Sequence, residues 1–297
     1  MSAPGIEVAD VFRRFLDDYI AEYGQPRLPS QRRAISDILG CMTEAMGGRR
    51  YRCEDCAESF WHYHGCRNRS CPRCHGRQIQ EWIEARTAQL LPCSYFHVVA
   101  TVPAELRRVF LAEQKYMYGL LMKVSARALC ELAADRRYLG AVPAVMSVLH
   151  TWTGQMLEHP HVHMLVSGGG VTADGNSWTE CAPNFLVPVK RLSPLIARRF
   201  REAVSKGRPD LSARIPENVW KREWCSYCRP TGEGREAVMN YLGRYVHRVA
   251  INRHRIVSMD DSHVVFRHKH HDTGEWKTIR ITGAEFIRRF LLHVLPR

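Results

Sequence analysis

The stretch HPHVHMLVSGGG, from His159 to Gly170, places two histidines two residues apart within an apolar run. Successive side chains of a β-strand point to opposite faces, so His161 and His163 are expected to share one face of a strand. The three glycines at 168–170 predict the end of that strand. The rest of the fold can be arranged around this histidine-bearing strand.

The histidine pair supplies two of the three protein ligands that a divalent-metal site needs. Residues 145–157 predict a second strand, joined to the first by a short polar turn. If the turn is centred near Glu158, antiparallel pairing places Gln155 opposite His161 on the same face. The sequence therefore predicts Gln155 as the third ligand, provided that the register does not slip by one residue.

Two other phosphate-processing patterns compete for the same histidines. With His159, the run also fits the His-x-His-x-His pattern of histidine-triad nucleotide hydrolases. Pro160 is a poor strand residue, however, and that interpretation leaves the cysteine and tyrosine motifs unexplained. The two-histidine phosphodiesterases are a poorer fit, because they require His-x-Thr/Ser twice.

Two Cys-x2-Cys pairs, Cys53/Cys56 and Cys71/Cys74, are separated by a short segment rich in aromatic residues and arginine. Each pair directs two thiolates toward one point, and two such pairs complete a tetrahedral zinc site. These four cysteines are the predicted zinc ligands. Four neighbouring residues remain alternatives that could replace a ligand or hold a second ion: Cys66, His62, His64 and His75. The pair Cys225/Cys228 lies in a strand-like run, where residues three apart point to opposite faces, and is expected to be incidental.

The patterns on either side of these motifs predict an α+β protein. Helical spacing covers 6–22 and 30–46, and residues 95–102 predict a buried strand. Later helices and strands alternate as far as a closing helix at 284–294, which suits an antiparallel sheet flanked by helices. We expect three parts: a helical region at 1–50, a zinc-binding domain at 51–91, and a catalytic domain at 92–297.

The chain of 297 residues has 43 Lys and Arg against 30 Asp and Glu, a net charge of +13. This excess points to a polyanionic partner, and nucleic acid is the first expectation. Arginines crowd the cysteine segment, where they are predicted to contact phosphates: Arg67, Arg69, Arg73 and Arg77.

The N-terminus has no basic region followed by an apolar run, and the longest uncharged stretch is too polar to cross a membrane. The sequence therefore predicts a cytoplasmic protein with no membrane partner.

Tyr241 and Tyr245 lie four residues apart in MNYLGRYVHRVAI, so on a helix both phenols share one face. An apolar stripe is the alternative reading for such a pair. Arg244 and Arg248 add positive charge beside it, however, and are also predicted to contact DNA. A phenol with a pKa near 10 needs such surroundings to attack as a phenolate. Tyrosine attack on a phosphodiester, helped by a divalent ion on the histidine pair, is the predicted chemistry.

These motifs together resemble the two-tyrosine HUH transposases of the insertion sequence 91 family, over most of the chain. The likeness rests on four segments: CRNRSCPRC at 66–74, the strand at 159–170, YLGRYVHRVAI at 241–251 and EFIRRFLLHVLP at 285–296. The resemblance implies an HUH endonuclease fold behind a zinc ribbon. It also implies rolling-circle transposition of single-stranded DNA through a 5′-phosphotyrosine.

By the same resemblance, His161 and His163 bind Mg²⁺ or Mn²⁺, Tyr241 and Tyr245 are the nucleophiles, and the N-terminal cysteines bind zinc. Family members usually continue beyond the segment that matches 292–296, so the chain is expected to be a shortened copy. A rolling-circle replication initiator, which shares the chemistry, is one alternative. A non-catalytic zinc-ribbon DNA-binding remnant is the other.

Overall fold

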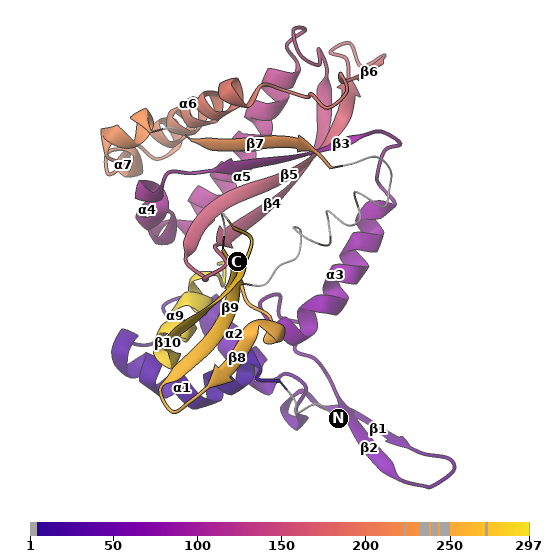
Figure 1. Cartoon of the computed structure of the whole chain (residues 1–297), viewed down its shortest axis with the longest axis vertical. Coiled ribbons are helices and arrows are strands. Elements are labelled where there is room, and N and C mark those ends of the chain that lie inside the picture. The colour runs from indigo at the N-terminus through magenta and orange to yellow at the C-terminus, as the bar shows by residue number, and fades with distance from the viewer. Residues whose placement is uncertain are drawn as a thin grey trace. The chain divides into compact units, whose positions relative to one another are not determined.

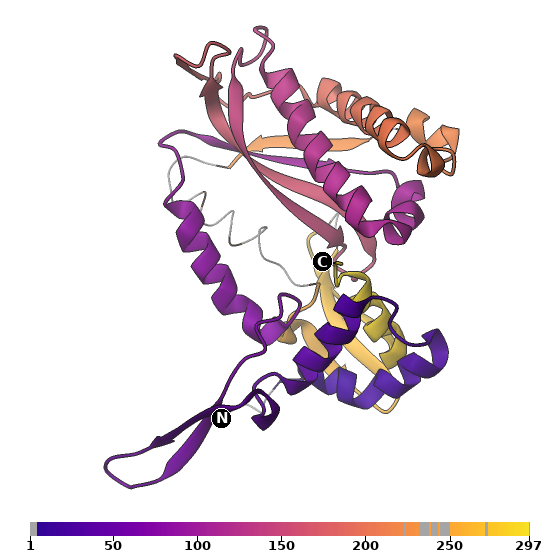
Figure 2. The ribbon, with the colours of Figure 1, turned by 180° about the vertical axis from the view of Figure 1, so that it is seen from behind.

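The computed structural model describes residues 5–222, 224–231, 238, 243, 250–270 and 273–296. They fall into two compact units, each shown in Figures 1 and 2. Unit 1 consists of Met1–Trp82, Trp152–Leu157 and Arg248–Arg297, and unit 2 consists of Ile83–Thr151 and Glu158–His247. Antiparallel sheets and helices occur in both, which confirms the α+β class.

Unit 2 is built on an antiparallel sheet in the order β4-β5-β3-β7, and β6 pairs with the C-terminal end of β5. Its strands are β3 (Tyr95–Thr101), β4 (Val142–Trp152, whose last residue lies in unit 1), β5 (Glu158–Val171), β6 (Trp178–Glu180) and β7 (Cys225–Pro230). Its helices are η2 (Ala104–Leu106), α4 (Arg107–Ala112), α5 (Gln114–Ala133), α6 (Val189–Gly207), α7 (Pro209–Ser212) and η3 (Glu217–Lys221). Figure 2 shows α5 lying across one face of the sheet. Phe110 of α4 and Phe200 of α6 are both buried, and their rings stack with centroids 5.9 Å apart, which joins these two helices.

The strand that carries the histidine pair is longer than the sequence predicts. Gly168, Gly169 and Gly170 continue β5 instead of ending it. The reason is close packing: a Cβ on Gly170 would lie 2.5 Å from the carbonyl oxygen of Val142, so a larger side chain would force the backbones apart. The glycines therefore permit the approach of neighbouring segments rather than breaking the strand.

Unit 1 combines the two ends of the chain around one apolar core. Its helices are α1 (Val8–Tyr23), α2 (Pro29–Gly40), η1 (Glu44–Met46), η4 (Arg253–Arg255) and α9 (Gly283–Leu292), and α3 (Pro72–Thr87) begins in this unit. Its strands are β1 (Gly48–Arg52), β2 (Ser59–Tyr63), β8 (Ile256–Met259), β9 (His263–Lys269) and β10 (Trp276–Thr282). The apolar face of α1 packs on α9, where Phe12 and Phe290 meet edge to face at 5.3 Å.

This packing divides the chain differently from the predicted boundaries at 50/51 and 91/92. The C-terminal strands and helix share a core with the N-terminal helices instead of extending the sheet of unit 2. The physical reason is that the apolar stripe of α1 needs a partner, and α9 supplies one. Among the described helices, none has the length and apolar character that a membrane crossing requires.

Candidate functional site

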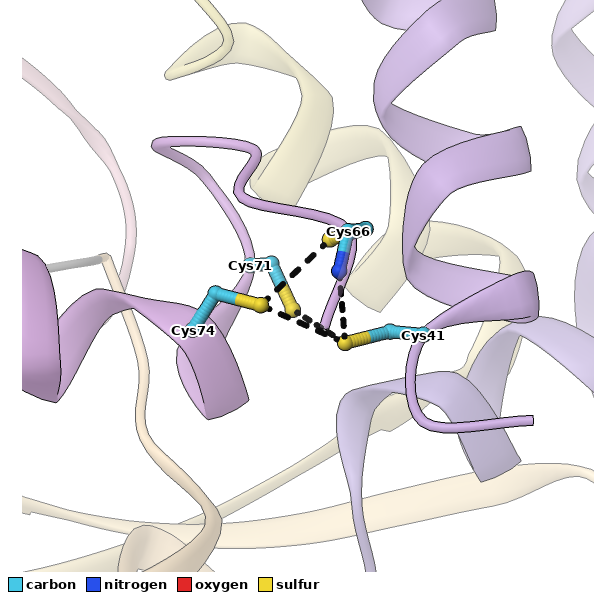
Figure 3. A group of neighbouring side chains, drawn as sticks. All are labelled: Cys41, Cys66, Cys71 and Cys74. Atoms are coloured by element: carbon cyan, nitrogen blue, oxygen red, sulfur yellow. Dashed lines mark hydrogen bonds between the residues drawn. The ribbon is translucent and has the colours of Figure 1, made fainter. Parts of the chain in front are cut away.

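Four cysteines of unit 1 converge on one point (Figure 3). Cys41 directly follows α2, Cys66 and Cys71 lie in the loop before α3, and Cys74 lies in the first turn of α3. Each offers a sulfur within 4.8 Å of the others. Cys41, Cys71 and Cys74 are buried and belong to the core of unit 1, so the cluster is fixed by packing as well as by its loops.

The sulfur spacing fits a tetrahedral zinc ion. Zinc–sulfur bonds of about 2.3 Å give a tetrahedron with edges of about 3.8 Å. The Sγ–Sγ distance is 3.4 Å between Cys41 and Cys74, 3.6 Å between Cys41 and Cys71, and 3.7 Å between Cys66 and Cys74. Backbone N–H groups add support, since the amide of Arg67 donates to Cys74 Sγ at 3.3 Å. These contacts match the way that outer hydrogen bonds hold thiolate ligands in place.

The four thiols cannot all lose their protons without a cation. Burial raises the pKa of Cys41 to about 12, and hydrogen bonding to Cys71, together with burial, raises that of Cys66. Cys71 has its pKa lowered to about 6, chiefly because it accepts a hydrogen bond from Cys66. A divalent ion at the centre would stabilise the remaining thiolates, which is the chemistry of a structural zinc site.

The cysteine cluster differs from the predicted zinc ligands at two of its four positions. Cys53 and Cys56 lie at the tip of the β1–β2 hairpin, where the N–H of Cys53 donates to the carbonyl of Glu58 at 2.8 Å. The ligand cluster contains Cys41 and Cys66 in their place. Cys66 had been an alternative ligand, whereas Cys41 lies far from any Cys-x2-Cys pair in the sequence and was missed.

Three histidines of unit 2 form a second cluster. His150 comes from β4, and His161 and His163 come from the same face of the adjacent strand β5. Each offers a ring nitrogen within 4.8 Å of the others. His150 and His163 are buried and His161 is partly buried. Imidazole nitrogens at this spacing suit a divalent transition metal or a related ion.

Neighbouring groups orient the rings of this histidine cluster. His161 Nδ1–H donates to the carbonyl of His159 at 2.7 Å, which leaves Nε2 as the lone-pair nitrogen. His163 Nδ1 lies 2.8 Å from Nε2 of His97 on β3. Burial lowers the pKa of His161, and burial together with the charge of His161 lowers that of His97 to about 4. Both imidazoles are therefore neutral near pH 7, the state in which a histidine binds a metal.

Gln155, the predicted third ligand, belongs to unit 1, whereas the three histidines belong to unit 2. The strands are joined by a turn at 153–157, closed by a hydrogen bond from Thr153 N–H to the carbonyl of Leu157, rather than by a turn centred on Glu158. Gln155 lies inside that turn, with its amide nitrogen 3.2 Å from Nε2 of His268. His150 could have been found in the sequence as the histidine of the strand before His161. Choosing it as a ligand, however, requires knowing where the turn between the two strands lies.

The predicted phosphate-binding arginines have different surroundings. Arg69 donates to the carbonyl of Leu295 at 2.8 Å, and Arg73 pairs with Glu7 at 3.0 Å, so both stabilise unit 1 internally. Arg67 borders a cavity of about 630 Å³ beside Cys74. The other three fall outside the part of the chain, or the side chains, that the structure describes: Arg77, Arg244 and Arg248.

Two further expectations concern the tyrosines and the second cysteine pair. Tyr241 and Tyr245 lie outside the described residues, as does the rest of the predicted helix apart from Val238 and Gly243.

Cys228 lies on β7 opposite Val98, and burial raises the pKa of its thiol to about 11. A thiol in that state is unreactive near pH 7.

Comparison with known proteins identifies relatives along the whole chain. Residues 11–102 match the family described as "Transposase zinc-binding domain", and residues 144–297 match the family described as "Putative transposase". "Putative transposase y4qJ" of Sinorhizobium fredii is 40% identical over 313 residues, covering 100% of this chain and 78% of that protein. "Transposase for insertion sequence element IS801" of Pseudomonas savastanoi pv. phaseolicola is 24% identical over 287 residues, covering 88% of this chain and 66% of that protein. No solved structure matches the chain.

A cysteine cluster within a zinc-binding domain, together with these relatives, defines a DNA-processing enzyme of the transposase class. The chain belongs to the insertion sequence 91 family of transposases and carries the zinc-binding domain of that family at its N-terminus. The resemblance inferred from the sequence motifs is therefore confirmed, and DNA is the polyanionic partner that the net charge of +13 indicated.

Proposed function

We propose that the chain is a metal-dependent, tyrosine-based endonuclease and strand transferase that acts on single-stranded DNA at the ends of its element. The observation that carries the proposal is the convergence of His150, His161 and His163 on two adjacent strands. Membership of a transposase family supplies the substrate class, and the histidines supply a place for a catalytic ion. Rolling-circle transposition is the process in which we expect these steps to occur.

The three histidines would hold a Mg²⁺ or Mn²⁺ ion, which would polarise an oxygen of the scissile phosphate. Tyr241 or Tyr245 would attack the phosphorus through its phenolate oxygen. The bond from phosphorus to the 3′ oxygen breaks, and that oxygen leaves as a 3′-hydroxyl after taking up a proton. The 5′-phosphate stays on the tyrosine, and a free 3′-hydroxyl can reverse the step because the bond energy is conserved.

A direct test uses the full chain with labelled single-stranded element-end DNA and Mn²⁺. We expect a covalent protein–DNA adduct that survives denaturing electrophoresis and fails to form when EDTA replaces the metal. The same sequence as a fully paired duplex should give much less adduct. Tight binding of the single strand without any adduct would overturn the proposal and favour a non-catalytic DNA-binding protein.

His150→Ala tests the third ligand. We expect weaker Mn²⁺ binding in titration calorimetry and an adduct rate lower by about 100-fold or more, because loss of even an outer partner of a metal site costs about 10–100-fold. Gln155→Ala is the matched control and should leave both quantities close to wild type. The opposite pattern, with Gln155→Ala the more damaging change, would restore the ligand that the sequence favoured.

His97→Ala tests whether His97 positions a ligand. The hydrogen bond at 2.8 Å fixes the ring of His163 so that its Nε2 can face the ion. Without it we expect Mn²⁺ affinity to fall by about 10–100-fold, as for other outer-sphere changes. His97→Gln offers a carbonyl oxygen that can accept from Nδ1–H, so it should recover much of the loss. Equal Mn²⁺ affinity in His97→Ala and wild type would contradict this role.

A further inference from the structure

The β1–β2 hairpin of unit 1 exposes its side chains on both faces. Its two strands pair only with each other among the described strands, and Figures 1 and 2 show the hairpin extending away from the helices of its unit. Phe60 is 61% exposed, Trp61 56% and Tyr51 44%. A two-stranded ribbon is only marginally stable in water, and large rings gathered on a surface mark an interaction site.

The register sorts the hairpin side chains into two similar faces. On one face Tyr51 lies opposite Phe60, and their rings stack with centroids 5.5 Å apart. On the other face Trp61 and Tyr63 are parallel to within 5°, with centroids 6.3 Å apart. Each face therefore presents a pair of stacked rings, the arrangement on which unpaired bases stack.

Positive charge accompanies the rings along the stem of the hairpin. Arg49 lies on the face of Tyr51, and Arg50 and Arg52 lie on the face of Trp61. All three are exposed, and within the described part of the chain none has a carboxylate partner. The acidic residues of the hairpin are confined to its tip: Glu54, Asp55 and Glu58. Phosphates are therefore attracted to the stem and repelled from the tip.

We propose that the stem of the β1–β2 hairpin, residues 48–52 and 59–63, is a binding surface for single-stranded DNA. Bases stack on the exposed rings, and the phosphates between them pair with the arginines. Single strands fit better than duplex because a paired base has no free face for a side-chain ring. The inference rests on the proposed function and adds a strand-holding surface that the histidines and tyrosines do not provide.

Two variants of the full chain test the surface: Tyr51→Ala/Phe60→Ala and Trp61→Ala. Loss of one stacked base is expected to weaken binding by about 5- to 150-fold, so each variant should bind a fluorescent single-stranded oligonucleotide at least about 5-fold less tightly in anisotropy titrations at fixed salt. Phe185→Ala is the matched control, since Phe185 is 43% exposed but lies outside the hairpin. Its affinity should equal that of wild type.

A second measurement does not depend on how the variants fold. Wild-type chain is photo-cross-linked to an iodouracil-substituted single strand, and the attached peptides are mapped by mass spectrometry. Cross-links at residues 48–63 are expected. Absence of such cross-links, or unchanged single-strand affinity in both ring variants, would overturn the proposal. If the variants bound duplex less tightly but single strands equally well, the surface would be a duplex-binding site instead. If only the oligomeric state changed, the surface would be a contact with a second copy of the chain. The adduct assay on wild type decides the proposed function separately.

Discussion

The double variant Tyr241→Phe/Tyr245→Phe is expected to form no covalent adduct with single-stranded element-end DNA, a loss of at least about 1,000-fold. Each substitution removes only the phenol oxygen, so the side-chain shape is retained and the nucleophile is lost. Each single variant keeps one nucleophile and should still form an adduct. Strand transfer should fall in both single variants, because two tyrosines allow two successive transfers without release of the first strand.

Tyr227 supplies the control for this experiment. It lies on β7 with its ring 5.5 Å from that of His97, and it is the described tyrosine whose ring contacts the residues around the histidine cluster. Tyr227→Phe should form adduct at the wild-type rate, and single-strand affinity should be unchanged in all the tyrosine variants. If Tyr227→Phe abolished the adduct while the double variant kept it, the nucleophile would be Tyr227 and the proposed assignment would be wrong.

Local patterns predicted the parts of this fold that depend on local geometry. Alternation along HPHVHMLV predicted a strand with His161 and His163 on one face, and the structure brings those two side chains together. Helical spacing at 6–22 corresponds to α1, and the α+β class followed from the mixture of elements. These features need only neighbours in sequence, which is why the sequence alone was informative.

The structure differs from these expectations where contacts join distant segments. Cys41 is a single cysteine after α2. It comes close to Cys71 and Cys74 where the segment that follows α2 contacts the start of α3, and there Arg73 donates to the carbonyl of Cys41 at 3.2 Å. His150 depends on where a turn falls, since a shift of the turn changes which residue of β4 meets β5. The sharing of a core by α1 and α9 has no local signal, because an apolar stripe does not specify its partner.

Cys41→Ser is expected to remove the zinc ion and to destabilise unit 1. Structural zinc contributes about 10–16 kcal/mol to folding in small zinc domains, and loss of the ion removes that contribution. A domain is stable by only about 5–15 kcal/mol, which makes that loss a large fraction of the total. Three of the ligating cysteines also lie in the core of unit 1, and an uncharged serine hydroxyl there would be a poor ligand and a buried polar group.

The measurement is zinc content by metal analysis together with the thermal unfolding midpoint. Wild type should hold one zinc ion per chain at the cluster, whereas Cys41→Ser and Cys66→Ser should lose it and unfold at a lower temperature. Cys53→Ser is the matched control, because Cys53 lies at the hairpin tip and outside the cluster. It should retain the zinc ion and the wild-type midpoint. Loss of zinc in Cys53→Ser with retention in Cys41→Ser would instead favour the two Cys-x2-Cys pairs, since the ion would then depend on the hairpin rather than on the segment that follows α2.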